Sequence, residues 1–269
     1  MTDTILVQQT GGIATLTFNR PAVYNAMNEA LIVAFCEAAV RLKATPSVRV
    51  LILKGAGNAF LAGGDVALFH SQRETISNRV IPMGNRLHEG IIALREAPFP
   101  VIAQIQGATA GAGLSVALCC DFAIAAETAT FNTAYANIGL SPDGGSTFFL
   151  PRIVGMKKAT ELLMLAERFT AAAALEMGLI NRVVAADQLE AEVNALAARL
   201  AAGPTQAYAR AKRLMNQSFS TPIATHLANE IAYFAECTTT ADFKEGVTAF
   251  VEKRKPVFTG VGAEPSTSG

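Results

Sequence analysis

Two glycine-rich junctions and one acidic turn are the parts of this sequence best suited to chemistry. Residues 59–65 (AFLAGGD) follow the apolar run 48–54, and residues 107–113 (GATAGAG) follow the apolar run 100–105. Each junction would expose backbone N–H groups that no bulky side chain covers, at a helix N-terminus where the dipole favours negative charge. Together they could hold one oxyanion, and Asp143 lies downstream on a Pro-Asp-Gly-Gly turn. An oxyanion site with one carboxylate is what chemistry beside a thioester carbonyl requires.

Composition limits the classes of ligand that the chain can bind. With 269 residues, 51% of them hydrophobic, it can bury a large core as one large domain or one domain with a small appendage. Its 22 basic and 22 acidic residues leave no broad field for nucleic acid or an anionic membrane, so neither is expected as a partner. The four cysteines lack the spacing of metal ligands, so no metal site is expected. No apolar run reaches the roughly 18 residues of a membrane span and no signal segment is recognised, so we expect a cytoplasmic protein.

The expected elements place the two junctions on an alternating β and α framework. Residues 5–7 and 13–18 alternate as strands around two glycines, which predicts an antiparallel hairpin. A helix over 28–44, capped by Asn28, precedes a strand over 48–53 that is apolar on both faces. Further elements are a helix over 79–97, a strand over 101–105, a helix over 111–120 and a strand over 122–125.

The last third of the chain is expected to be helical. Helices are predicted over residues 157–166, 170–177, 186–202, 204–216, 221–237 and 239–253, with a short strand over 180–184. Thr170 is a predicted N-cap, and Gly178 fits the position just after a helix. Because these helices are amphipathic and poor in charge, we expect them to pack on the first part of the chain or on a neighbouring subunit. The predicted division is a core over 1–200, a helical region over 201–258 and a flexible tail over 259–269.

Five motifs, in their order and spacing, resemble those of a known superfamily. They are NRP at 19–21, NAMN at 25–28, GAGNAFLAGGD at 55–65, PVIA at 100–103 and FVEKRK at 250–255. The chain resembles the crotonase (enoyl-CoA hydratase/isomerase) superfamily from about residue 4 to 258. The resemblance implies an α/β fold, a crotonase-like spiral of β-β-α units with a helical C-terminal region that makes the contacts of a homotrimer or hexamer. It also implies an acyl-CoA thioester substrate and no cofactor, since coenzyme A is part of the substrate.

The same resemblance implies roles for individual residues. The oxyanion donors fall on the N–H groups of Gly64 and Ala112. Asp65 is expected to cap the helix that follows rather than to act on the substrate. Where the family contacts the adenine and pantetheine of coenzyme A, this chain has Tyr24, Asn25, Ala26 and Ala62, and at the nucleotide end, commonly of a neighbouring subunit, it has Phe250 and Lys253.

Side chains distinguish the reactions of the superfamily. Its hydratases use two glutamates to handle water, and the matching positions here are Ser115 and Tyr135. Two hydroxyl groups cannot activate and orient water as two carboxylates do, so ordinary hydration is disfavoured. Asp143 matches the aspartate of the isomerase branch, which includes 1,2-epoxyphenylacetyl-CoA isomerase-like proteins. We expect an apolar wall to shield this carboxylate from water; its members are Tyr135, Leu140, Phe148 and Phe149.

One carboxylate is enough for an isomerase. It can take a proton from C2 or C4 of a 3-enoyl thioester and return it to the other carbon, while the main-chain donors hold the enolate oxygen. The expected activity is therefore a double-bond shift from 3-enoyl-CoA to 2-enoyl-CoA, as in fatty acid metabolism, or isomerisation of a ring-epoxide acyl-CoA, as in phenylacetate degradation. The acyl group itself is not determined by the sequence.

Three other functions remain open at this stage. The first is an enoyl-CoA hydratase with atypical residues. The second is a hydrolase resembling 4-chlorobenzoyl-CoA dehalogenase, in which an aspartate at Asp143 attacks an aryl carbon and a histidine at His88 helps, although Tyr135 stands where that branch has a tryptophan. In the favoured interpretation His88 is a helix residue that partly lines the cavity. The third is a non-catalytic acyl-CoA-binding module, which the loss of both glutamates favours and the presence of Asp143 disfavours.

Overall fold

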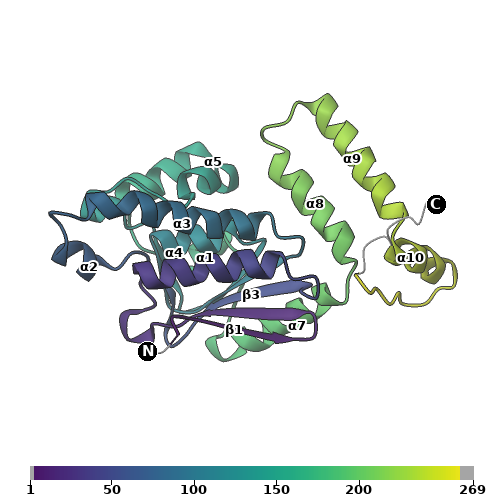
Figure 1. Cartoon of the computed structure of the whole chain (residues 1–269), viewed down its shortest axis with the longest axis horizontal. Helices are drawn as coiled ribbons and strands as arrows, with labels where there is room; N and C mark the ends of the chain where they lie inside the picture. Colours follow the sequence, from purple (N-terminus) through teal and green to yellow (C-terminus); the bar gives the residue numbers. More distant parts are fainter. Residues whose placement is uncertain (1–2, 261–269) are drawn as a thin grey trace.

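Two sheets organise the computed structural model, which describes residues 3–260 (Figure 1). The larger sheet has the order β1-β2-β3-β5-β7-β10 and the smaller one the order β4-β6-β8-β9. The larger sheet comprises β1 (Ile5–Thr10), β2 (Ile13–Phe18), β3 (Val50–Gly55), β5 (Val101–Ile105), β7 (Phe122–Ala126) and β10 (Arg182–Val184). The smaller sheet comprises β4 (Ala59–Leu61), β6 (Ala108–Ala110), β8 (Thr130–Asn132) and β9 (Phe169–Thr170).

The helices follow the strands in a repeating order. They are α1 (Glu29–Lys43), α2 (Val66–Ser71), α3 (Ser77–Arg95), α4 (Ala112–Cys119), α5 (Ser146–Leu165), α6 (Ala171–Glu176), α7 (Leu189–Ala201), α8 (Thr205–Gln217), α9 (Ile223–Thr238) and α10 (Ala241–Val251), with 3-10 turns η1 (Pro21–Val23), η2 (Ala136–Ile138) and η3 (Ala186–Gln188). Three successive units, starting at β3, β5 and β7, each place one strand in the larger sheet, the next strand in the smaller sheet and then a helix. This repeat confirms the expected alternation of β-β-α units.

The predicted hairpin is present at one edge of the larger sheet. β1 and β2 pair antiparallel from Ile5 opposite Phe18 to Thr10 opposite Ile13. The turn between them contains Gly11, whose φ of 56° lies in the left-handed region that glycine adopts without strain. From β2 onward the neighbouring strands of this sheet run parallel, which the helical crossovers between them allow.

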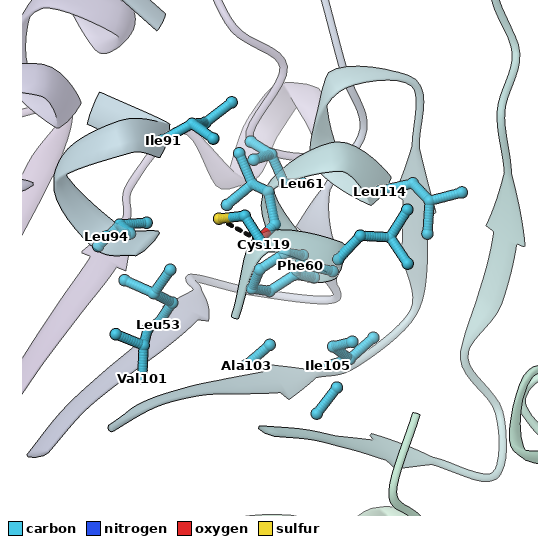
Figure 2. Close-up of a cluster of buried hydrophobic side chains, with 14 of the residues drawn as sticks. Leu53, Phe60, Leu61, Ile91, Leu94, Val101, Ala103, Ile105, Leu114 and Cys119 are labelled. Atoms are coloured by element: carbon cyan, nitrogen blue, oxygen red, sulfur yellow. Dashed lines mark hydrogen bonds between the residues drawn. The ribbon is translucent and has the colours of Figure 1, made fainter. Parts of the chain in front are cut away.

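Helices cover both faces of the parallel strands, as their continuous apolar runs predict. Along β3, Val50 and Ile52 face α7, while Leu51 and Leu53 face the layer that contains α1, α3 and α4. Figure 2 shows this layer: Leu53 and Val101 lie below Ile91 and Leu94 of α3, and Ala103 lies below Phe60. Each such large side chain contributes about 1.5–3 kcal/mol when fully buried, so the layer that carries α3 and α4 is firmly held.

Side-chain caps begin three helices where the sequence predicts them. The side chains of Asn28, Asp65 and Thr170 each accept a hydrogen bond from a backbone N–H three residues ahead. Asp65 also pairs with Arg20, at 3.1 Å between Nη1 and Oδ2, which links the NRP motif to the first glycine-rich junction. The expectation that Asp65 is a cap is therefore confirmed.

One helix differs from its prediction because of a kink. The pattern predicts a helix over 157–166, whereas α5 begins at Ser146 and contains Gly155 with φ 76° and ψ 162°. The helix therefore consists of two segments, and the second corresponds to the predicted one. Pro151 and Gly155 obscured the first segment in the sequence, because both residues normally interrupt a helix.

The helices α8, α9 and α10 stand apart from the two sheets (Figure 1). Lys212 of α8 is buried and joins this arm to the core, because its ammonium donates to the oxygens of Leu94 and Phe99 and to Asp121 at 2.7–3.2 Å. By contrast, α9 buries none of its residues, and Ile231 and Phe234 are 65% and 66% exposed. A separate trimerisation region over 201–258 stays a prediction.

Two further predictions concern the end of the chain and membranes. The backbone N–H groups of Thr259 and Gly260 donate to the carboxylate of Asp242. The rest of the predicted flexible tail, residues 261–269, lies outside the described residues. Within residues 3–260, no helix has both the length and the apolar character needed to cross a membrane.

Candidate active site

The two glycine-rich junctions meet at one cavity of about 710 Å³ between the smaller sheet, α2, α3 and the loop after β8. Gly64 and Ala112, the predicted oxyanion donors, both line it. Gly63 has a φ of 88°, and a Cβ on it would lie 2.8 Å from the oxygen of Ala110 and 3.5 Å from the nitrogen of Ala112. Only glycine allows the first junction to approach the second so closely.

The backbone of each junction leaves an N–H group available to the cavity. Met27 donates to the oxygen of Gly63 at 2.6 Å and accepts from the N–H of Asp65 at 3.0 Å. This parallel bridge leaves the N–H of Gly64 on the side away from Met27. Ala112 is the first residue of α4, and a helix provides no internal partner for its first N–H groups. The two donors therefore have the character of an oxyanion hole.

A close contact between α4 and β4 fixes the direction of the second donor. A Cβ on Gly113 would lie 1.9 Å from the oxygen of Leu61, so the helix can pack against the strand only with glycine at this position. Gly111, just before the helix, donates its N–H to the oxygen of Asn132 at 3.0 Å. The start of α4 is thus held from both sides, and its N–H groups need no rearrangement to receive a developing negative charge.

Asp143 lines the same cavity, and within residues 3–260 it is the only carboxylate that does so. It lies on the exposed turn between η2 and α5. Its Oδ1 accepts a hydrogen bond from the hydroxyl of Tyr135 at 2.6 Å, a length typical of a charge-assisted O–H···O⁻ bond. The described side chains donate no hydrogen bond to Oδ2. Asp143 is therefore an acid–base group whose Oδ1 accepts a hydrogen bond, while its Oδ2 receives none from the described side chains.

Ser115 and Tyr135, at the two positions of the hydratase glutamates, both contact the turn of Asp143. The hydroxyl of Ser115 donates to the main-chain oxygen of Asp143 at 3.0 Å, and that of Tyr135 lies 3.2 Å from the same oxygen. Burial, and then the negative charge of Asp143, raise the pKa of Tyr135 well above its usual value. Tyr135 therefore stays protonated and acts as a hydrogen-bond donor throughout the neutral range.

His88 of α3 also lines the cavity. The N–H of Gly144 donates to its Nε2 at a long 3.4 Å. An imidazole thus lies beside the turn that carries Asp143, as the favoured interpretation of His88 expects. Most of the remaining wall is apolar; its larger members are Met27, Ile32, Phe69, Ile81, Met83 and Leu140. A wall of this composition suits an acyl chain rather than a sugar or a peptide.

The expected apolar shield around Asp143 is only partly present. Tyr135 and Leu140 line the cavity of Asp143, but Phe148 and Phe149 line a second cavity behind the turn. This difference arises because both phenylalanines lie in the first turn of α5, whose helical start the sequence did not reveal. Asp143 consequently remains exposed to the solvent on one side.

The residues that the resemblance links to coenzyme A are spread over a wider region. Ala62 lines the cavity. Tyr24 is 61% exposed outside it, and Asn25 is fully buried with its amide bonded to main-chain oxygens of residues 56–60. Phe250, 85% exposed, and Lys253 lie at the end of α10, away from the cavity lining. Contacts of these residues and of Ala26 with coenzyme A stay predictions.

The sequence of this chain matches the model of the enoyl-CoA hydratase/isomerase family over residues 8–261. The chain belongs to this family. It is 39% identical over 260 residues to a Rhodobacter capsulatus protein named "Probable enoyl-CoA hydratase", covering 96% of this chain and 98% of that protein. It is 35% identical over 265 residues to the 1,2-epoxyphenylacetyl-CoA isomerase of Escherichia coli, covering 97% of this chain and all of that protein. The relatives within the family thus carry both hydratase and isomerase names.

The fold of the family is also evident in solved structures. An enoyl-CoA hydratase from Polaromonas sp. JS666 superposes with a TM-score of 0.90 at 35% identity, covering 94% of this chain and 99% of that one. The chain therefore has the crotonase fold, a mixed α/β architecture with a helical C-terminal region, and is an enzyme of the enoyl-CoA hydratase/isomerase superfamily. Because one fold serves several reactions in this family, the reaction must be argued from the site.

Several residues that the sequence suggested for the site line one cavity, but the sequence did not reveal their mutual contacts. The hydrogen bonds of Ser115 and Tyr135 to Asp143 join residues 28 and 8 positions apart along the chain. No local pattern signals such a contact, since it depends on how α4 packs against the loop after β8. Arg168, an exposed cation on the cavity lining, was also missed, because it lies beside β9, a strand of two residues.

Proposed function

We propose that this enzyme is an acyl-CoA isomerase that shifts the double bond of a 3-enoyl-CoA to give the 2-enoyl-CoA. The observation that carries the proposal is that Asp143 is the one carboxylate within residues 3–260 on the lining of the cavity that the two glycine-rich junctions share. A hydratase would need a second acid–base group for water, and the two hydroxyl groups at the glutamate positions are bonded to the turn of Asp143 instead.

The proposed reaction uses Asp143 twice. Its carboxylate removes a proton from C2 of the 3-enoyl thioester, and the electrons of the C–H bond move into the thioester carbonyl to form a dienolate. The N–H groups of Gly64 and Ala112 stabilise the oxygen that becomes negative. The electrons then return through the dienolate, and C4 takes the proton back from the Asp143 carboxyl. No atom is gained or lost, so a single acid–base group completes the cycle.

Deuterium incorporation tests the proposal. Wild-type enzyme is incubated with a 3-enoyl-CoA in deuterated water, and the acyl product is examined by mass spectrometry and NMR. We expect 2-enoyl-CoA and no 3-hydroxyacyl-CoA, with deuterium at C4, and at C2 after reversal of the first step, because the exposed Asp143 carboxyl exchanges its proton with the solvent. Rapid formation of 3-hydroxyacyl-CoA would instead establish hydration and exclude the proposal. A ring-epoxide of phenylacetyl-CoA, tested in parallel, determines whether the same carboxylate serves the second kind of isomerisation.

A second candidate function is hydrolysis of a halobenzoyl-CoA, because His88 lies beside the turn of Asp143. In that reaction the carboxylate attacks the aryl carbon and halide leaves. His88 then takes a proton from the water that hydrolyses the aryl ester, which regenerates Asp143. Release of halide from 4-chlorobenzoyl-CoA would favour this function, and its absence alongside isomerisation would exclude it.

The proposed assembly is a homotrimer or a pair of trimers. The apolar, unburied face of α9 supports it, because a monomer rarely leaves so much apolar surface in water. The same assembly would bring Phe250 and Lys253 of one subunit near the substrate of another. Light scattering coupled to gel filtration should give three or six times the mass of one chain, and a monomeric mass would exclude the assembly.

A further inference from the structure

The strongest unassigned contact in the cavity is the one between Tyr135 and Asp143. The side chain of Tyr135 is 9% exposed, and its hydroxyl lies 2.6 Å from Oδ1 of Asp143. Ser115, which is fully buried, holds the main-chain oxygen of Asp143 at 3.0 Å and lies 3.4 Å from the hydroxyl of Tyr135. Two buried hydroxyl groups therefore hold an otherwise exposed turn, Tyr135 through the carboxylate of Asp143 and Ser115 through its main-chain oxygen.

We propose that Tyr135 is the positioning residue of the reaction, which holds Oδ1 of Asp143 and leaves Oδ2 as the oxygen that moves the proton. This role rests on the proposed isomerase function. Without the hydroxyl, the carboxylate of Asp143 would rotate freely on its exposed turn. A bond to one oxygen restricts that rotation and directs the other oxygen into the cavity, which keeps the base in reach of the acyl chain.

Tyr135 can hold this role across the working pH range because it does not ionise there. Burial and the adjacent carboxylate both favour its neutral form. A neutral phenol donates a hydrogen bond to a carboxylate more strongly than to a carboxylic acid.

Other charged or titratable groups face the same cavity and must be considered. His88 approaches the turn from α3, and Arg168 lines the cavity beside β9. Neither is hydrogen-bonded to the carboxylate of Asp143 among the described contacts. Tyr135 is therefore the group whose removal changes the carboxylate directly, while a change at His88 would act through the main chain of Gly144.

Replacement of the hydroxyl by hydrogen tests the proposal. For Tyr135→Phe we expect kcat to fall about 10- to 100-fold with KM changed less than about threefold, because the ring is kept and only the carboxylate is released. The acid limb of the pH profile of kcat should also change, since the carboxylate loses its only side-chain donor among the described residues. Tyr233→Phe, a matched change on α9, should leave the kinetics unchanged. The same substitution made in the His88→Gln variant shows whether the change in the pH profile of kcat is due to His88.

An NMR titration separates failure of this role from failure of the proposed function. In ligand-free enzyme with labelled aspartate carboxyl carbons, the signal that Asp143→Asn removes belongs to Asp143. Its midpoint should move in Tyr135→Phe, and thermal unfolding should confirm that the variant is folded. An unchanged midpoint or an unchanged kcat would overturn the positioning role whatever the substrate. If wild-type enzyme isomerises no enoyl-CoA, the proposed function is excluded. The positioning role of Tyr135 in that reaction is then excluded as well, even if the midpoint of the Asp143 signal moves.

Discussion

The two sides of the candidate site are built in different ways. On one side, Gly64 and Ala112 present main-chain N–H groups at the ends of buried elements. On the other side, Asp143 presents a side chain from an exposed turn that Tyr135 and Ser115 hold. The first side is fixed by the packing of the whole core, whereas the second depends on two hydroxyl groups.

This difference separates what the family shares from what it varies. Stabilisation of an enolate needs only a backbone of a certain shape, and the glycines at 63 and 113 provide that shape through close approaches that no other residue permits. The choice between adding water and moving a proton needs particular side chains. Relatives named hydratase and relatives named isomerase both match this chain over almost its whole length, so the fold alone does not determine the reaction.

The largest effect on kcat should come from a change to the side chain of Asp143. Asp143→Asn keeps the shape of the turn and can still accept the hydrogen bond of Tyr135, but it cannot take a proton. We expect kcat for isomerisation to fall about 1,000-fold, within the range that a lost acid–base group produces. Asp187→Asn, on an exposed 3-10 turn, is the control.

Steady-state kinetics and calorimetric binding of a non-reactive acyl-CoA measure the two consequences of this change. Binding should persist while turnover is lost. If Asp143→Asn retained activity within about threefold, another group would be the base. If neither protein turned over any acyl-CoA but both bound it, a non-catalytic binding module would be the better account.

A substitution that removes a main-chain N–H tests the other side of the site, where Gly64 and Ala112 lie. Ala112 is the first residue of α4, where proline is tolerated because no helical hydrogen bond is lost. Ala112→Pro removes the N–H and should lower kcat about 100-fold, the effect of one missing oxyanion donor. Ala112→Gly keeps the N–H and should retain most of the activity. Equal losses in the two variants would show that the side chain, and not the main-chain donor, matters at this position.

The buried support of the main-chain side can be tested through Asn25. Its amide donates to the oxygens of Ala56, Ala59 and Phe60 and accepts from the N–H of Arg20, all within 2.9–3.2 Å. Asn25→Ala removes these four hydrogen bonds inside the buried core and should lower the free energy of unfolding by about 3 kcal/mol. Urea denaturation followed by circular dichroism measures the change, with the exposed Asn194→Ala as control. A loss below about 0.5 kcal/mol would show that this network does not support the first junction.

The sequence predicted those features of the fold that depend on local patterns. The hairpin, the caps at Asn28, Asp65 and Thr170, and the doubly buried strands each follow from residue types within one element. The smaller sheet was not predicted, because strands of two or three residues carry too little periodicity to be recognised. Its pairing is decided by the larger sheet and the helices around it.

The contacts that hold Asp143 were beyond sequence reasoning for a related reason. Matching the family identified Ser115, Tyr135 and Asp143 as the residues that differ between reactions, but not that the first two hold the third. That relation arises only when α4 is packed against the loop after β8. Likewise, Phe148 and Phe149 face the second cavity because α5 starts earlier than its pattern suggests.

The smallest effect should come from Ser115, which touches the main chain of Asp143 and not its carboxylate. In Ser115→Ala the oxygen of Asp143 keeps the hydroxyl of Tyr135 at 3.2 Å and the N–H of Ser146 at 3.4 Å. The loss of one of several hydrogen bonds should therefore lower stability by about 1 kcal/mol and kcat by about threefold, without moving the pH profile. Ser218→Ala, where an exposed hydroxyl donates to the oxygen of Met215, is the matched control. If Ser115→Ala moved the acid limb as far as Tyr135→Phe, the hydroxyl pair would act on Asp143 as one unit, and the carboxylate would not be controlled by Tyr135 alone.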